Sequence, residues 1–436
     1  MTIHTLQAGF RSFYRYKAIL IKVLHSLEQF YILLALLLFS QSFLTILQGG
    51  SAAESITDGN PLVQKIWAFI YAVALLLCCI RWRAVIIVIR QDKLLLLLTF
   101  VVILSLTWSA APEMTLRRSF ALIGTNLFGL YMAIRFSLKQ QFKLVSRMLL
   151  VVIVFSFLFG LFLPQYGVMS DNRGTAWQGV LSHKNQLGRL MCFSSVLFFV
   201  FMFNKGEKKK LIWLGLGGSF LLMLLSTSKT ALVIMLVLLM LIPFLQSFRW
   251  NISIAVLYWM FALLIAGGAI SLLFSNADLL LSLMDRDVTL TGRTDLWAAV
   301  WEMIKQRPLL GYGYNGFWLG LDGESAYVWL VTKWDPPHSH NGLLDVWLDL
   351  GVVGVILVLL HMIRGFKLGV TYIRQTRTII SFCPLLYFMF MFLYNLTENT
   401  ILRPNSVFWV LYVSISLSLS IAIRRHKRKE NKGGIV

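Results

Sequence analysis

Charged residues are scarce in this chain. They make up 14% of the 436 residues, whereas hydrophobic residues make up 58%, and the mean hydropathy is +0.74. A water-soluble domain with this balance would expose too much apolar surface to stay in solution. The composition therefore excludes a soluble globular protein and indicates a chain whose apolar segments face lipid.

Acidic residues are especially few, with 19 Asp and Glu against 40 Lys and Arg and a net charge of +21. Of the 40 basic residues, 27 lie in segments that would share one face of the membrane with both termini. These segments are the N-terminal tail, 81–93, 135–147, 205–210, Arg249, 364–377 and 424–432. This is the distribution of the positive-inside rule, so we expect cytoplasmic termini and no nucleic-acid partner. We expect the basic cytoplasmic tail, 424–436, to contact anionic lipid.

The chain has only four cysteines, Cys78, Cys79, Cys192 and Cys383. All four lie in apolar runs and none in an outer loop, so we expect buried reduced thiols rather than disulfides or zinc ligands. Internal repeats, low-complexity segments and a separate soluble domain are also absent from the sequence. We therefore expect one membrane domain over residues 1–436.

Twelve apolar runs approach the length needed to cross a bilayer, which is about 17–25 residues. They are 29–48, 64–80, 94–110, 118–136, 147–163, 188–204, 211–227, 230–247, 252–273, 344–362, 379–396 and 406–423. Each is expected to be a helix, because a segment inside lipid must satisfy its own backbone hydrogen bonds. We expect the first to be an uncleaved anchor rather than a signal peptide. The predicted fold class is an all-α polytopic membrane protein.

Two segments on the predicted outer face are longer than the other connections. They are 164–187 and 274–343, and long connections in compact proteins are usually functional or disordered. The second is rich in Trp, Tyr and Gly, and its pattern over 294–306 predicts a helix, so we expect a folded, partly helical periplasmic lid. Almost no ionisable residue lies in the middle of the apolar runs, where a proton-coupled transporter usually carries one. These features favour an enzyme that works at the outer face.

Four outer-face segments combine cations or histidines with glycines and small polar residues. "SDNRGTAWQGVLSHKNQLGR" contains Arg173, and "STSKT" contains Lys229. "TGRTDLW" contains Arg293 and is followed by "RPLLGYGYNGF". The last segment is "HSHNGLLDVWLDLGVVG", which runs from His338 to Gly354.

Together these segments resemble the O-antigen ligase and polymerase superfamily. His340 and Asn341, followed after nine residues by Gly351 and then Gly354, fit its C-terminal signature. "NRGTAWQGVLSHKNQLG" resembles its Arg-and-Gly loop, and "SHKN" is similar to the form in exopolysaccharide polymerases. "STSKT" resembles a Ser-x-Ser-Arg turn, with Lys229 in place of the usual Arg.

The resemblance covers about residues 94–362. It implies a GT-C-like fold with about twelve transmembrane helices in the bacterial inner membrane. It also implies transfer of a glycan from an undecaprenyl-pyrophosphate carrier to an acceptor hydroxyl at the periplasmic face, without a metal or other cofactor.

A pyrophosphate leaving group needs cationic partners as the glycosidic bond breaks. Guanidinium groups suit this role because they stay protonated and bind phosphate oxygens with two N–H groups. Arg173 and Arg293 are therefore the predicted catalytic arginines, and Lys229 is a weaker substrate-binding candidate. Contact with lipid headgroups or a carboxylate is the ordinary alternative, and we expect it for Arg117 and Arg118.

The acceptor hydroxyl needs a proton acceptor when it attacks the anomeric carbon. Histidine, with an ordinary pKa near 6.5, suits this work at neutral pH. The spacing to Gly351 and Gly354 selects His340 over His338 as the catalytic base, although a histidine at a helix mouth is commonly a cap or a headgroup contact. The two glycines are expected to be structural, because small residues let helices approach closely.

Further residues are predicted to contact substrate. They are His183, Lys184, Asn185, His338 and Asn341.

A pair of carboxylates raises the alternative of a metal-dependent enzyme. Asp285 and Asp287 form an Asp-x-Asp pair, which could hold Mg²⁺ or Mn²⁺, but lone pairs of this kind occur by chance, so we expect no metal site. Asp345 and Asp349 are expected to keep the first helical turns polar rather than to orient an imidazole.

Three functions remain open from the sequence. A polymerase would extend a lipid-linked glycan with another lipid-linked repeat unit, and a ligase would move finished glycan to lipid A-core or another acceptor. The "SHKN" segment favours the polymerase, whereas a transporter would not need His and Arg in a long outer loop. The expected partners are membrane lipid and an undecaprenyl-pyrophosphate-linked glycan. A chain-length regulator would be a further partner of a polymerase.

Overall fold

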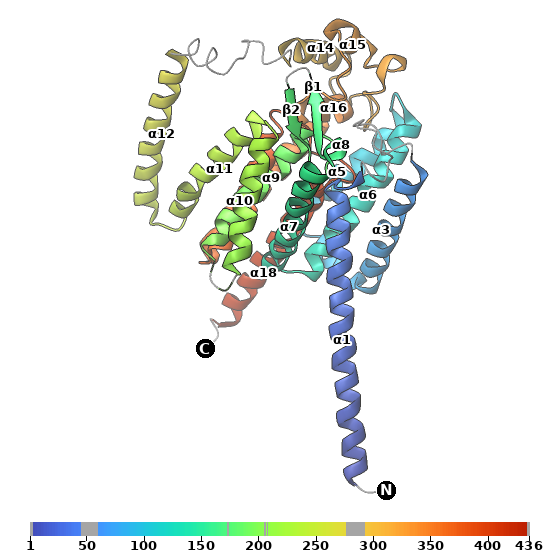
Figure 1. Ribbon diagram of the computed structural model, residues 1–436, viewed down its shortest axis with the longest axis vertical. Helices are drawn as coiled ribbons and strands as arrows, with labels where there is room; N and C mark the ends of the chain where they lie inside the picture. Colours follow the sequence, from blue (N-terminus) through green and yellow to red (C-terminus); the bar gives the residue numbers. More distant parts are fainter. Residues whose placement is uncertain are drawn as a thin grey trace.

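The protein is described here from a computed structural model. The structure describes residues 3–44, 60–171, 174–204, 206, 208–275 and 293–433. Within these residues the chain is mostly helical, with one antiparallel hairpin of β1 (Val168–Asp171) and β2 (Gly174–Trp177) (Figure 1). The all-α class is therefore confirmed. Arg173 and the Asp285 to Asp287 pair lie outside the described residues.

Each of the twelve predicted spans overlaps a helix. The main bundle consists of α1 (Ile3–Phe39), α3 (Pro61–Ile80), α4 (Trp82–Ile89), α5 (Lys93–Leu104), η2 (Ser105–Thr107), α6 (Pro112–Arg135), α7 (Leu138–Phe162), α8 (Pro164–Gly167), α9 (Lys184–Met202), α10 (Lys209–Leu225), α11 (Lys229–Ser247), α12 (Ile252–Ser275), α16 (Gly342–Gln375), η5 (Ile379–Ser381), α17 (Phe382–Tyr394) and α18 (Val407–Gly433). Among the described helices, seven are long and apolar enough to cross a membrane, and three apolar helices are shorter. The structure supports a multi-pass membrane protein, and the number twelve stays a prediction.

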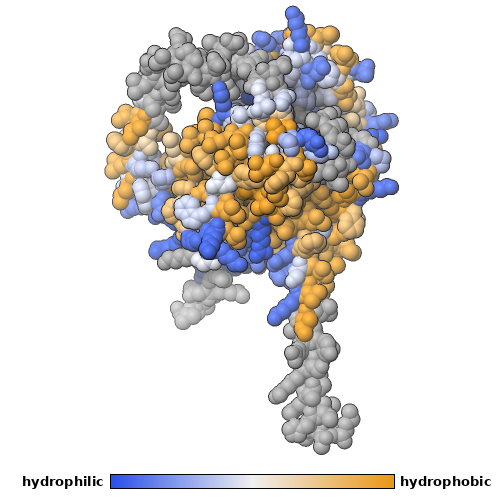
Figure 2. All heavy atoms as spheres, in the orientation of Figure 1, coloured by the Kyte–Doolittle hydropathy of each residue, from blue (hydrophilic) through white to orange (hydrophobic). Residues whose placement is uncertain are grey.

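The outer surface of the bundle is apolar. Figure 2 shows hydrophobic residues across the middle of the molecule, with hydrophilic residues gathered above and below them. Large apolar side chains such as Phe162, Met240 and Leu263 are more than 70% exposed. Apolar surface on this scale marks contact with lipid rather than water.

The free cysteines differ from expectation at one position. Cys78, Cys192 and Cys383 are buried, as predicted, but Cys79 is exposed. Consecutive residues on a helix point in different directions, so α3 can turn only one of its two neighbouring thiols toward the core. The prediction of a buried thiol was therefore wrong for Cys79.

Ion pairs hold helices together toward the end of the bundle where α1 begins and α18 ends (Figure 1). Asp92, just before α5, accepts hydrogen bonds from Arg364 at 2.7 Å and Ser416 at 2.9 Å, and its carboxylate lies 3.1 Å from His361. These contacts connect the start of α5 to α16 and α18. At the same end, Glu28 pairs with Arg81 at 3.0 Å.

The helix α16 carries the signature glycines and is kinked at Gly351. This residue has φ 65° and ψ −168°, and a Cβ there would lie 2.0 Å from the carbonyl oxygen of Leu309. The backbone of the "PLLGYG" segment bonds on both sides of the kink, through Tyr312 N–H to Leu348 O at 2.7 Å and Val352 N–H to Pro308 O at 2.9 Å. Glycine at position 351 lets this loop and the helix approach so closely.

Residues 293–341 form a folded layer over this end of α16, which we call the cap. It contains α14 (Arg293–Gln306), η4 (Gly320–Asp322) and α15 (Ala326–Thr332), and α14 corresponds to the helix predicted over 294–306. The cap has a small hydrophobic core, which it shares with α16. Its buried members are Leu296, Ala299, Val300, Met303, Ile304, Tyr312, Phe317, Val328 and Leu348. The cap and the α16 kink together set the position of His340.

Candidate active site

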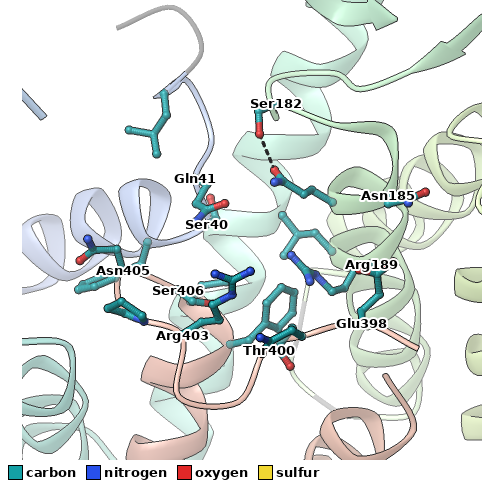
Figure 3. Close-up of a pocket in the computed structure, with 18 of the residues that line it drawn as sticks. Ser40, Gln41, Ser182, Asn185, Arg189, Glu398, Thr400, Arg403, Asn405 and Ser406 are labelled. Atoms are coloured by element: carbon teal, nitrogen blue, oxygen red, sulfur yellow. Dashed lines mark hydrogen bonds between the residues drawn. The ribbon is translucent and has the colours of Figure 1, made fainter. Parts of the chain in front are cut away.

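A polar pocket lies under the cap, where the ends of α1 and α9 meet α6 and the 395–406 loop between α17 and α18. Its volume is about 110 Å³. Three guanidinium-bearing residues line it: Arg118 from α6, Arg189 from α9 and Arg403 from the 395–406 loop. Figure 3 shows Arg189 and Arg403 pointing toward one another across the space. We call this cavity the arginine pocket.

The arginine pocket suits an anion. Among its described lining residues, Glu398 is the one carboxylate against three arginines. Arg189 lies over the ring of Phe408 at 5.0 Å, and its buried Nε has no hydrogen-bond partner among the described residues. A buried donor without a partner is costly, and phosphate oxygens would satisfy it.

Glu398 joins two of the predicted catalytic residues. Its Oε2 lies 3.6 Å from Nδ1 of His340, and its Oε1 lies 3.6 Å from Nη2 of Arg293. His340 has φ 53°, a left-handed conformation that non-glycine residues seldom adopt, and its ring is stacked near Trp334 with centroids 6.0 Å apart. His340 and Arg293 therefore both lie beside the carboxylate of Glu398.

Glu398 is charged at neutral pH. Burial by itself would raise the pKa of Glu398. Its contact with His340 and the positive charges of Arg189 and Arg293 outweigh burial, so the pKa lies below the usual glutamate value. His340 therefore has a negative charge beside Nδ1.

His338 differs from His340 in its surroundings. It is 5% exposed, its ring centroid is 4.3 Å from that of His340, and its Nδ1 accepts a hydrogen bond from the His340 N–H at 3.0 Å. Burial, and then the nearby His340, Arg403, Arg189 and Arg293, lower the pKa of His338 well below its ordinary value. A neutral His338 with Nδ1 already occupied supports the turn that presents His340.

The same side chains form a candidate donor set for a metal ion. Ligand atoms of His338, His340 and Glu398 lie within 4.8 Å of one another, and two imidazoles with a carboxylate are a common donor set. However, Nδ1 of His338 already accepts a backbone hydrogen bond, and arginines surround the cluster. The positive field of these arginines opposes a divalent cation, so the residues fit an anion better than a metal.

Asp345, in the first turn of α16, supports the site from below. Its carboxylate accepts hydrogen bonds from Ser339 N–H at 3.0 Å, Trp318 Nε1 at 3.0 Å and Asn399 Nδ2 at 2.6 Å. These bonds connect the cap, the His338 to His340 turn and the loop that carries Glu398. Asp345 thus has a structural role in addition to keeping the first helical turn polar.

Asn341 is the N-cap of α16. Its Oδ1 accepts hydrogen bonds from the backbone N–H groups of Leu343 at 3.0 Å and Leu344 at 3.2 Å. This capping fixes the start of the helix directly after His340. A substrate contact through Asn341 stays a prediction.

The remaining predicted residues are divided between the pocket and its surroundings. Asn185 lines the arginine pocket, with its side chain directed away from the two arginines in Figure 3. His183 caps α9 by accepting from Asn185 N–H at 3.1 Å. Neither His183, Lys184 nor Lys229 is among the described lining residues. Gly354 is buried in α16, beyond the kink.

Four pocket residues escaped the sequence analysis. Arg118 was expected to contact headgroups but lines the pocket instead, and Arg189, Glu398 and Arg403 were not proposed. Arg189 ends the "SHKNQLGR" segment, so that segment could have pointed to it. Glu398 and Arg403 lie in a short loop without a motif, and no local pattern identifies them.

Comparison with known proteins agrees with the resemblance of the motifs. Residues 212–359 match a protein family described as O-Antigen ligase, a range that includes Lys229, Arg293 and His340. The chain is 26% identical over 274 residues to the exopolysaccharide production protein ExoQ of Rhizobium meliloti. These similarities support a relationship to the O-antigen ligase and polymerase superfamily.

Other relatives in the superfamily match shorter stretches. Proteins named "Putative polysaccharide ligase" from Rickettsia felis and Rickettsia conorii are 31% and 33% identical over 78 residues. The alignments cover 62% of ExoQ and 60% of this chain, but only 19% of each Rickettsia protein and 17% of this chain. The chain therefore spans less than two thirds of the length of each of these relatives.

Proposed function

We propose that this protein is a polysaccharide polymerase of the inner membrane. It would transfer a glycan from an undecaprenyl-pyrophosphate donor to a sugar hydroxyl of another lipid-linked repeat unit at the periplasmic face. The observation that carries the proposal is the arginine pocket beside the His340 and Glu398 pair.

The donor half of the proposal uses the arginine pocket. Arg118, Arg189 and Arg403 would bind the pyrophosphate, and Arg293 would add charge from the cap. Arg173 and Lys229 stay predicted contributors. Fixed positive groups stabilise a leaving pyrophosphate most strongly when charge develops on it, so this half lowers the barrier to glycosidic bond cleavage.

The acceptor half uses His340. In the tautomer that carries its proton on Nδ1, beside Glu398, Nε2 of His340 keeps its lone pair and can accept the proton of the acceptor hydroxyl. The acceptor oxygen then bonds to the anomeric carbon, and the bond from that carbon to the pyrophosphate oxygen breaks. The products are the lengthened glycan and undecaprenyl pyrophosphate, with inversion at the anomeric carbon after this single displacement.

A ligase is the alternative function. It would use the same arginines and histidine with lipid A-core or another acceptor. The similarity to a protein named for exopolysaccharide production, together with the "SHKN" segment, favours a polymerase, whereas the Rickettsia relatives carry a ligase name. A chain-length regulator would be a partner only of the polymerase.

The two functions differ in their products. Purified protein in lipid vesicles, given a pyrophosphate-linked repeat unit alone, is expected to form a ladder of longer lipid-linked glycans. Glycosylation of lipid A-core without any ladder would contradict the polymerase and support the ligase. A second arm with EDTA is expected to leave the ladder unchanged, and loss of activity restored by Mg²⁺ would contradict metal-free transfer.

A further inference from the structure

A second charged cavity lies at the end of the bundle opposite the cap, where α7 and α10 begin and α9 ends. Its volume is about 290 Å³, larger than the arginine pocket. A water molecule needs on the order of 10–15 Å³ of such space, so this cavity has room for a larger group. We call it the basic cavity.

One wall of the basic cavity is cationic. Lys143 and Arg147 of α7 line it together with Lys208, which precedes α10. Lys143 and Arg147 are four residues apart, so they share one face of the helix, and like charges at this spacing repel each other. No carboxylate is present among the described residues that line the cavity. An anion between these side chains would relieve the repulsion.

Other basic residues at this end of the bundle donate hydrogen bonds to backbone carbonyls of the protein. Lys209 donates to the carbonyl of Met202 at the end of α9, and Arg249 donates to the carbonyls of Thr376 at 3.0 Å and Thr378 at 2.8 Å. Arg147 and Lys208 are both exposed, and both line the basic cavity.

Most of the remaining lining of the basic cavity is apolar. The apolar members are Leu150, Phe198, Phe201, Leu211 and Ile212. Beside it, Trp213 and Leu214 on α10 are 59% and 51% exposed, as expected of side chains that face lipid. A ligand for this cavity therefore combines an anionic group with a hydrocarbon chain.

We infer that the basic cavity binds an anionic glycerophospholipid of the membrane. The phosphate lies between Lys143, Arg147 and Lys208, and an acyl chain follows the apolar lining toward the surrounding lipid. Basic pockets between transmembrane helices near the cytoplasmic face are suited to such headgroups. Inorganic phosphate would leave the apolar lining without a partner.

Such a lipid would link three helices that lead to the active site. α9 carries Arg189 near its other end, and α7 continues into the β1–β2 hairpin. α9 and α10 already pack closely, since a Cβ at Gly215 would meet the ring of Phe198 at 2.5 Å. A lipid bound at the basic cavity thus stabilises α9, the helix that positions Arg189. Lipid binding at the basic cavity does not depend on the proposed polymerase function.

Native mass spectrometry of the full-length protein in detergent tests this inference. Phosphatidylglycerol and phosphatidylethanolamine are titrated into wild type, into Arg147→Ala/Lys208→Ala and into the control Lys139→Ala/Lys210→Ala. The control removes the same charge from exposed positions outside the cavity lining. Each cation near a membrane phosphate contributes modestly, so the cavity variant is expected to lose roughly tenfold to thirtyfold in phosphatidylglycerol affinity.

Wild type and control are expected to prefer phosphatidylglycerol and to unfold at a higher temperature when it is added. Equal loss in both variants, or equal binding of the two lipids by wild type, would overturn the inference. A stabilisation by inorganic phosphate as large as that by phosphatidylglycerol would instead indicate a simple phosphate site, and would also overturn it.

Discussion

At the scale of single residues, Glu398 does most to define the candidate site. It lies 3.6 Å from both Arg293 and His340, and it comes from a loop far from both in sequence. A carboxylate here can hold one tautomer of the imidazole and leave Nε2 as the proton acceptor. Asp345 then supports Glu398 indirectly, through its 2.6 Å hydrogen bond from Asn399.

Glu398→Gln keeps the size of the side chain and removes its charge. The variant is expected to lower kcat by roughly tenfold to a hundredfold, because positioned acid–base groups contribute about 10²–10⁴ and Glu398 acts through His340. Donor KM is expected to change little, since the arginine pocket is kept. A kcat equal to wild type across the pH profile would show that Glu398 does not position the base.

His338 makes the protein sensitive to acid. Its folded-state pKa is lowered by burial and by neighbouring positive groups, so the unfolded chain takes up the proton first. Its contribution is complete above the ordinary value of about 6.5, and below it stability falls by about 1.4 kcal/mol per pH unit until the folded-state pKa is reached. Glu398, whose pKa is also lowered, adds to the loss only at more acidic pH.

The measurement is the unfolding temperature of the purified protein between pH 7.5 and pH 5, in steps of about half a pH unit. His338→Gln is expected to be less stable at pH 7.5 but to lose less stability toward pH 5. The same acid slope in both proteins would rule out His338 as its source.

At the scale of elements, the kink in α16 connects the signature glycine to the site. Gly351 allows the "PLLGYG" loop to bond on both sides of the helix break, and the cap packs over the same turn. The first turn of α16, with its Asn341 cap, then begins directly beneath His340.

Gly351→Ala would place a Cβ against the Leu309 carbonyl and force a left-handed conformation on alanine. The left-handed conformation alone costs on the order of 1–3 kcal/mol, and the backbone clash adds to it. A fall in unfolding temperature together with loss of transfer activity is the expected result. Gly217→Ala is the control, because a Cβ there meets nothing within 4 Å; similar behaviour of both variants would refute the role of the kink.

The Asp92 cluster makes a separate prediction about the other end of α16. Asp92→Ala leaves buried His361 and the partly buried Arg364 without their carboxylate. Breaking a buried pair by removing one partner costs about 3–5 kcal/mol. The unfolding temperature in detergent is expected to fall clearly, whereas exposed Glu113→Ala should change it little. An unchanged unfolding temperature for Asp92→Ala would mean that the cluster does not hold α5, α16 and α18 together.

At the scale of the whole molecule, the apolar runs predicted the helices well because lipid leaves the backbone few alternatives. Each predicted span overlaps a helix, and the spacing around His340 pointed to the loop where the pocket lies. Glu398 and Arg403 could not be predicted, because tertiary packing brings the 395–406 loop to Arg293 and His340, which are distant from it in sequence. Cys79 shows a related limit, since an apolar run does not tell which face of a helix meets lipid.

The central claim is that His340 accepts the proton of the acceptor hydroxyl beside an arginine pocket that binds the donor pyrophosphate. Its most direct test is single-turnover transfer from a pyrophosphate-linked repeat unit, measured for wild type, His340→Ala and the control His426→Ala near the end of α18. We predict that His340→Ala binds the donor and unfolds at the wild-type temperature but transfers at least about a hundredfold more slowly, while His426→Ala is unchanged. Transfer by His340→Ala at the wild-type rate would contradict the account.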